Sequence, residues 1–145
     1  MARPILILRV GSKFFGVDIE YAKSVIAPLP LTEMPKSPSY LVGVVNVRGS
    51  ITPVMDLGAR VDADAKEKRR ICIVDAGSGP AGLLVDDVLE VADAESAKLT
   101  DEWFGQSSFV SSVARLRLVH FANDDDESIV LILDIPSLLS ARIAA

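Results

Sequence analysis

The chain has 145 residues, half of them hydrophobic, with a net charge of −5 at pH 7 and a pI of about 4.8. This length suits about one domain that buries roughly 70% of its unfolded surface. The acidic balance argues against binding to nucleic acid or to an anionic membrane surface, since both require a basic footprint. No stretch approaches the roughly 18 apolar residues of a membrane helix, so we expect no direct membrane insertion.

Five short strands are predicted in the first half of the chain, over residues 5–10, 14–19, 24–26, 42–47 and 51–55. Phe15 and Val17 fall on one face of the second strand at period two. Residues 18–23 predict one helical turn before the third strand. Four prolines within residues 28–38 exclude a helix or a central strand and predict an extended loop across the surface.

Five further strands are predicted in the second half, over residues 71–75, 82–85, 88–92, 113–121 and 129–133. Residues 59–67 are predicted to form a loop, and residues 93–106 to be irregular or weakly helical. A terminal helix over residues 137–143 follows Pro136, which we place at its first position. About ten short strands with frequent turn signals indicate an all-β barrel or sandwich. We expect one domain over residues 1–145, since no linker divides the chain.

The single cysteine, Cys72, excludes an intrachain disulfide and gives no sign of an oxidising compartment. It lies in the apolar run of residues 71–74, which favours a small core residue over a reactive thiol. The apolar N-terminal stretch is too short for a signal peptide and is interrupted by Arg9. A cytoplasmic location is therefore expected.

No group of residues predicts catalysis. His120 is the only histidine and has no second ligand or nucleophile to work with. The acidic run of residues 124–127 lacks the spacing of an EF-hand loop. Asp86 and Asp87 are adjacent, so on a strand they point to opposite faces and cannot act as an acid–base pair. Residues 77–80 are glycine-rich without the lysine of a phosphate loop. We expect no enzyme, no catalytic residue, no metal and no cofactor.

The most informative segment is residues 43–57, GVVNVRGSITPVMDL. Two β-branched runs flank the polar residues 46–49, and Asn46 and Gly49 tolerate the positive φ of a tight turn. The segment therefore predicts a β-hairpin with Arg48 at its bend.

Apolar residues outside the predicted strands suggest a surface for a partner. Leu29, Leu31 and Met34 lie in the proline-rich loop, and Pro53 and Val54 are placed beside a strand edge. Exposed apolar residues near an incomplete barrel edge are typical of partner contacts in β proteins. The alternative is that these residues cap the ends of a barrel internally.

Residues 43–57 resemble the signature of the CheW-like family, in which a GV-N-RG-PV-DL pattern recurs. This family comprises adaptor proteins of bacterial and archaeal chemosensory arrays. The resemblance extends over nearly the whole chain, through residues 15–19, 35–40, 82–88 and 129–139. It implies an all-β fold of two small intertwined five-stranded β-barrels with a short C-terminal helix.

The same resemblance implies a chemosensory adaptor that couples chemoreceptors, the methyl-accepting chemotaxis proteins, to a CheA-type histidine kinase. One barrel face would dock the regulatory domain of the kinase, and the groove between the barrels would take the cytoplasmic tip of a receptor. The adaptor would then be associated with membrane-bound receptor arrays through its partners. Carried over by position, the receptor groove comprises Arg48, Gly43, Ala22, Ser24 and Asn46, and the kinase face comprises Ile51, Pro53 and Val54.

Two positions depart from the family pattern. Many members have a glutamate that pairs with the arginine where this chain has Ser24, and residues 110–113 lack the usual glycine. Three alternatives follow for Arg48: it pairs with Glu20, it pairs with Glu33, or it is free to meet a carboxylate on a partner. The alternative function is a divergent CheW-like scaffold of another two-component or motility pathway that has lost or changed its receptor contact.

Overall fold

A computed structural model describes residues 4–35, 38–61, 63, 66–93, 98–100, 109–116 and 128–140. Its elements, in chain order, are β1 (Pro4–Val10), β2 (Lys13–Asp18), β3 (Ala22–Ile26), β4 (Leu41–Val47), β5 (Ser50–Asp56), α1 (Leu57–Val61), β6 (Arg70–Asp75), β7 (Pro80–Val85), β8 (Asp87–Asp93), β9 (Lys98–Thr100), β10 (Val110–Leu116), β11 (Ser128–Leu133) and α2 (Ile135–Ser140). Neither helix of this described part is long and apolar enough to span a membrane.

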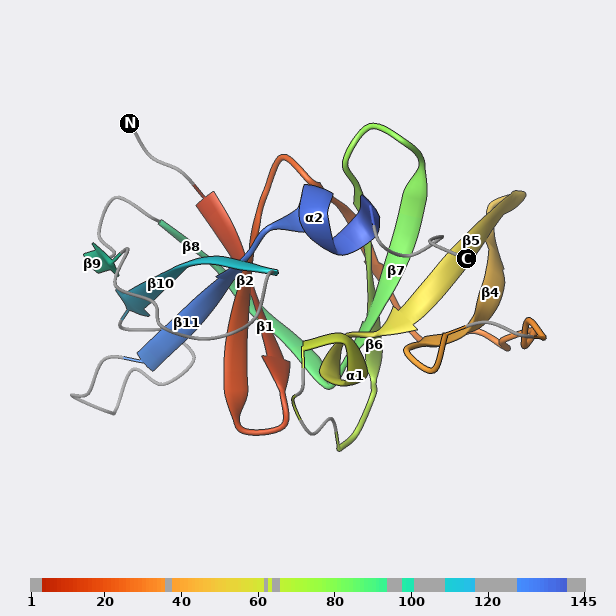
Figure 1. The fold of residues 1–145 in the computed structure, drawn as a ribbon, viewed down its shortest axis with the longest axis horizontal. Coiled ribbons are helices and arrows are strands. Elements are labelled where there is room, and N and C mark those ends of the chain that lie inside the picture. The colour runs from red at the N-terminus through yellow and green to blue at the C-terminus, as the bar shows by residue number, and fades with distance from the viewer. Residues whose placement is uncertain are drawn as a thin grey trace.

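The strands form two sheets, which lie side by side in Figure 1 with α2 between them. The six-stranded sheet has the order β8-β1-β2-β11-β10-β9, and the five-stranded sheet has the order β3-β6-β7-β5-β4. We refer to them as the six-stranded and five-stranded subdomains. The chain starts in the first, crosses to the second for β3 to β7, and returns at β8, which confirms the expected intertwined all-β fold. The strand counts are six and five rather than five each, and no pairing among the described strands closes either sheet into a ring.

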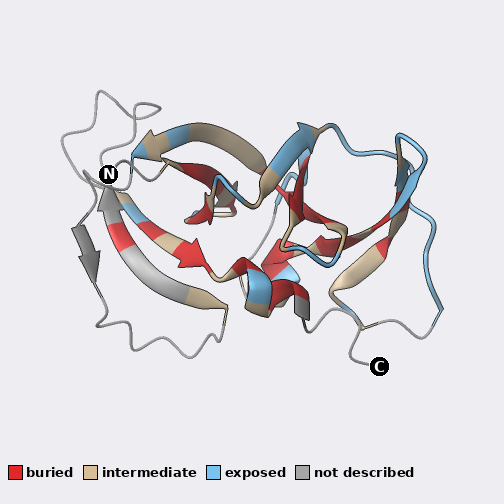
Figure 2. Ribbon diagram, turned by 90° about the horizontal axis from the view of Figure 1, so that it is seen from above, coloured by how far each residue is buried: buried red, intermediate tan, exposed pale blue. Residues whose placement is uncertain are grey.

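The apolar runs are continuous because several strands bury both of their faces. On β1, Ile5 and Ile7 face a core inside the six-stranded subdomain, whereas Leu6 and Leu8 face a central core between the subdomains. On β6, Ile71 and Ile73 likewise face a core inside the five-stranded subdomain, whereas Cys72 and Val74 join the central core. Figure 2 shows buried residues gathered where the two halves meet. The central core therefore holds the two subdomains together.

Cys72 is a core residue, as its sequence context predicts. Its side chain is fully buried in the central core. Burial disfavours the thiolate and raises the pKa of Cys72 to about 12.

Two elements differ from the sequence-based expectation. Residues 59–67 are expected to be loop, but α1 continues directly from β5 as far as Val61, with Leu57 buried in the central core. The described residues 63, 66 and 67 have no regular structure, as expected. The segment of residues 93–106 was expected to be irregular or weakly helical, but it contains the strand β9, which pairs with β10. Both elements depend on tertiary contacts, those of α1 with β7 and of β9 with β10, which local sequence patterns do not predict.

The start of α2 also differs. The helix begins at Ile135 rather than after Pro136, because Asp134 is its N-cap. The Asp134 carboxylate accepts the Ser137 backbone N–H at 3.2 Å and the Ser137 hydroxyl at 2.8 Å. The expectations for residues 141–143, for His120 and for the acidic run of residues 124–127 lie outside the described residues.

The turn before β3 is close to the expected one. Tyr21 donates its backbone N–H to the carbonyl of Asp18 at 3.0 Å, and Ala22 donates to Ile19 at 3.2 Å. The strand then begins at Ala22, two residues earlier than predicted.

Candidate partner-binding surface

The hairpin between β4 and β5 holds Arg48 at its bend, as the sequence predicts. Val47 pairs with Ser50, so Arg48 and Gly49 form a two-residue turn. Their φ angles of 51° and 85° are those of a type I′ turn, whose twist matches that of the flanking strands. The side-chain Oδ1 of Asn46 accepts the backbone N–H of Gly49 at 2.8 Å. Asn46 therefore fixes the turn that presents the arginine.

Arg48 has no intramolecular partner in the part of the chain that the structure describes. Its side chain is exposed, and no hydrogen bond or ion pair joins it to Glu20 or to Glu33. Of the three alternatives for this arginine, the structure leaves the third, a guanidinium that is free to meet a carboxylate from outside.

The expected receptor residues fall into two groups. Gly43, Asn46 and Arg48 lie on β4 and its hairpin, whereas Ala22 and Ser24 lie on β3. These strands stand at the two ends of the pairing order of the five-stranded sheet. Ser24 is exposed and pairs with β6, after a register shift that follows Ala22. No β-pairing joins the two groups within the described strands.

Gly43 serves the packing of the proline-rich loop. Thr32 in this loop exchanges both backbone hydrogen bonds with Val44, at 3.0 and 2.9 Å. A Cβ atom at Gly43 would lie 2.6 Å from the Thr32 carbonyl oxygen, and Gly43 has a φ of 150°. The glycine therefore permits the loop to lie directly against β4.

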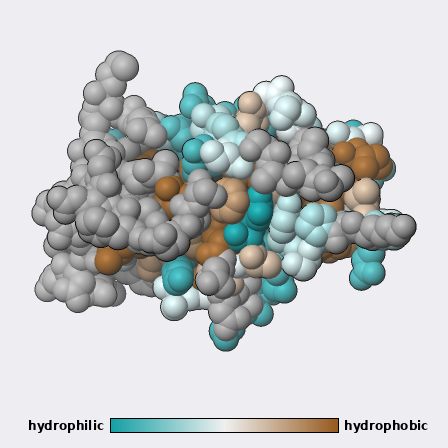
Figure 3. Space-filling view, viewed as in Figure 1, coloured by the Kyte–Doolittle hydropathy of each residue, from teal (hydrophilic) through white to brown (hydrophobic). Residues whose placement is uncertain are grey.

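The apolar side chains of the proline-rich loop are exposed. They therefore face solvent rather than capping the end of a barrel. The exposed fractions are 39% for Leu29, 38% for Leu31, 46% for Met34 and 66% for Ile51. Figure 3 shows a hydrophobic area at the end of the molecule where β4 and β5 meet. The hairpin and the loop together form a surface that carries these apolar residues and Arg48, which is unpaired as far as the described residues go.

Two residues assigned to the kinase face are less accessible. Val54 is fully buried in the core of the five-stranded subdomain, so its side chain is not available to a partner in this structure. Pro53 is half-buried and lies opposite Val44. Val44 directs both of its backbone groups to Thr32, so it forms no hydrogen bond with Pro53. The backbone of Pro53 therefore faces β7 rather than β4. Pairing with β7 begins only at Val54, so the missing N–H of Pro53 interrupts no ladder hydrogen bond.

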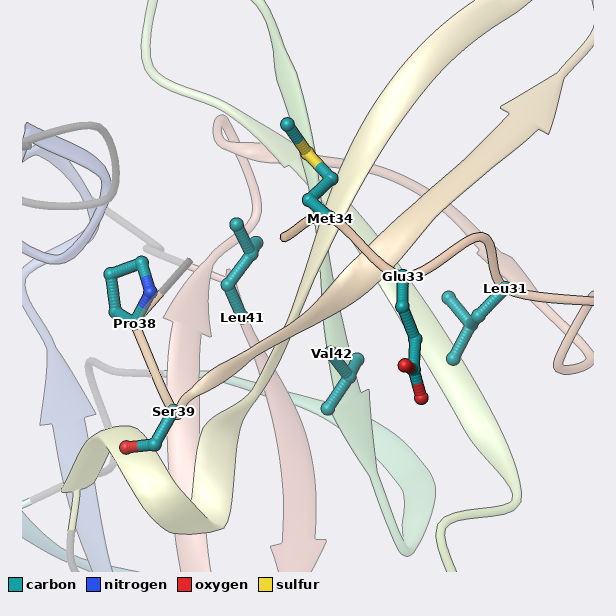
Figure 4. A pocket seen from close by; sticks show the side chains of 7 residues that line it. All are labelled: Leu31, Glu33, Met34, Pro38, Ser39, Leu41 and Val42. Atoms are coloured by element: carbon teal, nitrogen blue, oxygen red, sulfur yellow. The ribbon is translucent and has the colours of Figure 1, made fainter. Parts of the chain in front are cut away.

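A shallow hollow of about 460 Å³ lies between the proline-rich loop and β4. It is lined by Leu31, Glu33, Met34, Pro38, Ser39, Leu41 and Val42. Figure 4 shows the side chains of Leu31, Glu33 and Val42 turned in one direction, with those of Met34 and Leu41 turned in the other. Five of its seven lining residues are apolar, but polar groups, among them the Glu33 carboxylate and the Ser39 hydroxyl, make up at least as much of its exposed surface.

Asp86 is a buried carboxylate that sequence reasoning did not single out for its environment. It accepts the backbone N–H groups of Gly11, Lys66, Glu67 and Lys68 at distances of 2.6 to 3.0 Å. Burial alone would raise the pKa of Asp86, but these donors outweigh it and hold the pKa at about 2. The carboxylate thus ties the β1–β2 turn and the loop before β6 to the β7–β8 junction.

Asp86 and Asp87, which are adjacent in the sequence, have different hydrogen-bond partners. Asp86 is saturated by backbone donors, and Asp87 accepts the backbone N–H of Val88 at 2.8 Å. Among the described residues, no three metal-ligating side chains come together. The exposed hairpin and loop are suited to contacts with another protein, whereas the buried carboxylate of Asp86 stabilises the fold.

Two joined β subdomains that present an arginine hairpin beside an apolar loop define a protein-interaction module. The comparisons with known proteins give the family, because the model of the CheW-like domain matches residues 4–142. The chain therefore belongs to the CheW-like family, and it is a chemosensory adaptor.

Individual relatives agree with this assignment. The chain is 28% identical over 141 residues to a probable chemotaxis protein CheW of Rhizobium etli, covering 95% of this chain and 88% of the relative. It is 34% identical over 119 residues to the chemotaxis protein CheW of Rhizobium meliloti, covering 78% and 75%. The crystal structure of the scaffolding protein TtCheW from Thermoanaerobacter tengcongensis matches with a TM-score of 0.76 and 28% identity, covering 92% of this chain and 90% of that one.

Proposed function

We propose that this adaptor couples the cytoplasmic tips of chemoreceptors to the regulatory domain of a CheA-type histidine kinase, and that it acts by docking, without catalysis. The observation that carries the proposal is Arg48, an exposed arginine fixed on a type I′ turn, which has no partner among the residues that the structure describes. It would work in the cytoplasm, associated with receptor arrays through these partners.

The receptor contact centres on Arg48. A guanidinium presents a rigid fork of donors that suits a carboxylate on a helical receptor tip. Asn46 supports this role because it fixes the turn, and Gly43 supports it because it sets the loop beside the hairpin. Ala22 and Ser24 on β3 would provide a second, smaller part of the receptor contact.

The kinase contact centres on Ile51, the most exposed of the large apolar side chains on the described surface. Burying such a side chain against a partner contributes about 1.5 to 3 kcal/mol. Pro53 follows it on the same strand and adds a half-buried apolar surface. Val54 would support this face only from the core beneath it.

Calorimetric titrations with a receptor signalling fragment and with the kinase regulatory domain test the proposal. Arg48→Gln removes the charge while keeping the length of the side chain, so receptor affinity should fall by about tenfold or more and kinase affinity should not change. Ile51→Ser should weaken the kinase complex alone. Arg70→Gln, at an exposed arginine on β6, is the matched control and should leave both affinities unchanged. Equal receptor affinities for Arg48→Gln and the native chain would contradict the receptor contact.

A second candidate is a divergent scaffold of another two-component or motility pathway with an altered receptor contact. The exposed Ser24, in place of the glutamate usual in the family, favours it. In that case the kinase domain should bind while the receptor fragment binds neither the native chain nor its Arg48→Gln variant.

A further inference from the structure

A second arginine, Arg60 in α1, lies where the two subdomains meet. Its Cζ atom lies 4.2 Å from the centroid of the Tyr40 ring and 4.1 Å from that of the Phe109 ring. Both distances fall within the range of cation–π contacts. Figure 1 shows α1 beneath the gap between the two sheets.

The two rings belong to different subdomains. Tyr40 directly precedes β4, and α1 follows β5, so Tyr40 and Arg60 belong to the five-stranded subdomain. Phe109 directly precedes β10 in the six-stranded subdomain. The Tyr40 carbonyl accepts the N–H of Asp56 at 2.7 Å, and the Phe109 carbonyl accepts that of Asp134 at 2.7 Å. Each aromatic residue is therefore anchored in its own subdomain through its backbone carbonyl, and the Arg60 side chain contacts both rings.

The guanidinium contributes to this contact without hydrogen bonds from two of its nitrogens. Its Nε and Nη2 atoms are buried and have no hydrogen-bond partner within the described residues. Unpaired buried donors are unfavourable, whereas the stacking of a desolvated cation on two rings is favourable. Because these effects have opposite signs, the net contribution of the contact to stability is smaller than the larger of the two. Its distinctive property is geometric, since a planar group between two rings admits few arrangements.

We propose that Arg60, Tyr40 and Phe109 form an orientation clasp, which fixes the angle between the two subdomains. Arg60 is then a positioning residue, and its effect is on subdomain geometry rather than on global stability. This inference does not depend on which partners the adaptor binds.

The test compares Arg60→Met and Arg60→Lys with the native chain by hydrogen exchange and by residual dipolar couplings. Neither replacement has a planar cationic group, so the amide of Asp134 should exchange about tenfold faster in both variants. The couplings should report a changed angle between the sheets. Amides of the β6–β7 ladder should exchange at native rates. Arg70→Met makes the same chemical change at an exposed arginine and should alter neither measurement.

Two outcomes would overturn the proposal. Native exchange at Asp134 and native couplings in both Arg60 variants would show that the contact orients nothing. Faster exchange throughout the β6–β7 ladder would show a general loss of stability instead. Phe109→Leu provides an independent variant, since it should reproduce the Arg60→Met effect, and combining the two should add nothing further.

Discussion

Replacing Asp86 with asparagine should destabilise the adaptor strongly, although the two side chains have nearly the same shape. Oδ1 of the carboxylate accepts the N–H groups of Lys66, Glu67 and Lys68, and Oδ2 accepts those of Gly11 and Lys66. An amide offers only one acceptor oxygen. Either orientation of the amide therefore places its NH₂ group against at least one backbone donor, which leaves that donor unsatisfied in a buried site.

The magnitude follows from the pKa of Asp86. The pKa of about 2 lies about 1.9 below the ordinary value of about 3.9 in an unfolded chain. At 1.36 kcal/mol per pKa unit, the charged form contributes about 2 to 3 kcal/mol to the free energy of unfolding. Because the pKa is lowered by folding, this contribution is fully present above about pH 5 and is lost as the pH falls towards 2.

Urea unfolding at pH 7, 5 and 3 measures both effects. At pH 7, Asp86→Asn should lower the free energy of unfolding by about 3 kcal/mol, or the melting temperature by about 6 to 12 °C for a chain of this size. Between pH 5 and 3 the native chain should lose more stability than the variant, which has no carboxylate to protonate at this position. Asp87→Asn, at the half-buried neighbour, is the control and should cost about 1 kcal/mol or less. A variant as stable as the native chain at pH 7, or one with the same pH dependence, would refute the role assigned to Asp86.

Two further predictions concern Gly43 and Cys72. Gly43→Ala should lower the free energy of unfolding by about 2 kcal/mol or more, because the new Cβ would lie 2.6 Å from the Thr32 carbonyl oxygen; an unchanged urea midpoint would contradict this. Cys72 should resist a thiol reagent at pH 8 in the folded protein and react readily in urea, because burial raises its pKa to about 12; rapid labelling without urea would show that the thiol is accessible.

Local signals in the sequence predicted the parts of the site that depend on neighbouring residues. Asn46 and Gly49 have the chemistry of a tight turn, and the structure places Arg48 at that turn. The β-branched runs on either side predicted β4 and β5 for the same reason. The prolines of the loop excluded a helix or a central strand, and the described residues of the loop form only an isolated bridge, between Thr32 and Val44, with exposed apolar side chains on either side.

Contacts between distant residues were beyond such signals. Asp86 and Gly11 are 75 positions apart, so no local pattern shows that their atoms meet. The burial of Val54 was not predicted for a related reason: strands that bury both faces carry continuous apolar runs, and period two does not distinguish an inner from an outer face there. The position of Arg48 relative to Ser24 could not be predicted either, because Ser24 lies on β3, at the opposite end of the strand order from β4.

The proposed partner contacts and the stability of the fold depend largely on different side chains, although Gly43 belongs to both sets. The junction is held by the central core and by Asp86, all buried, whereas Arg48 and Ile51 lie exposed at the outer hairpin. An apparent dissociation constant rises only in proportion to the loss of the binding-competent fraction. A domain with 5 to 15 kcal/mol of stability keeps most of its molecules folded after losing about 3 kcal/mol. Asp86→Asn should therefore leave both partner affinities nearly unchanged at 25 °C, whereas Arg48→Gln should weaken receptor binding without changing the urea midpoint.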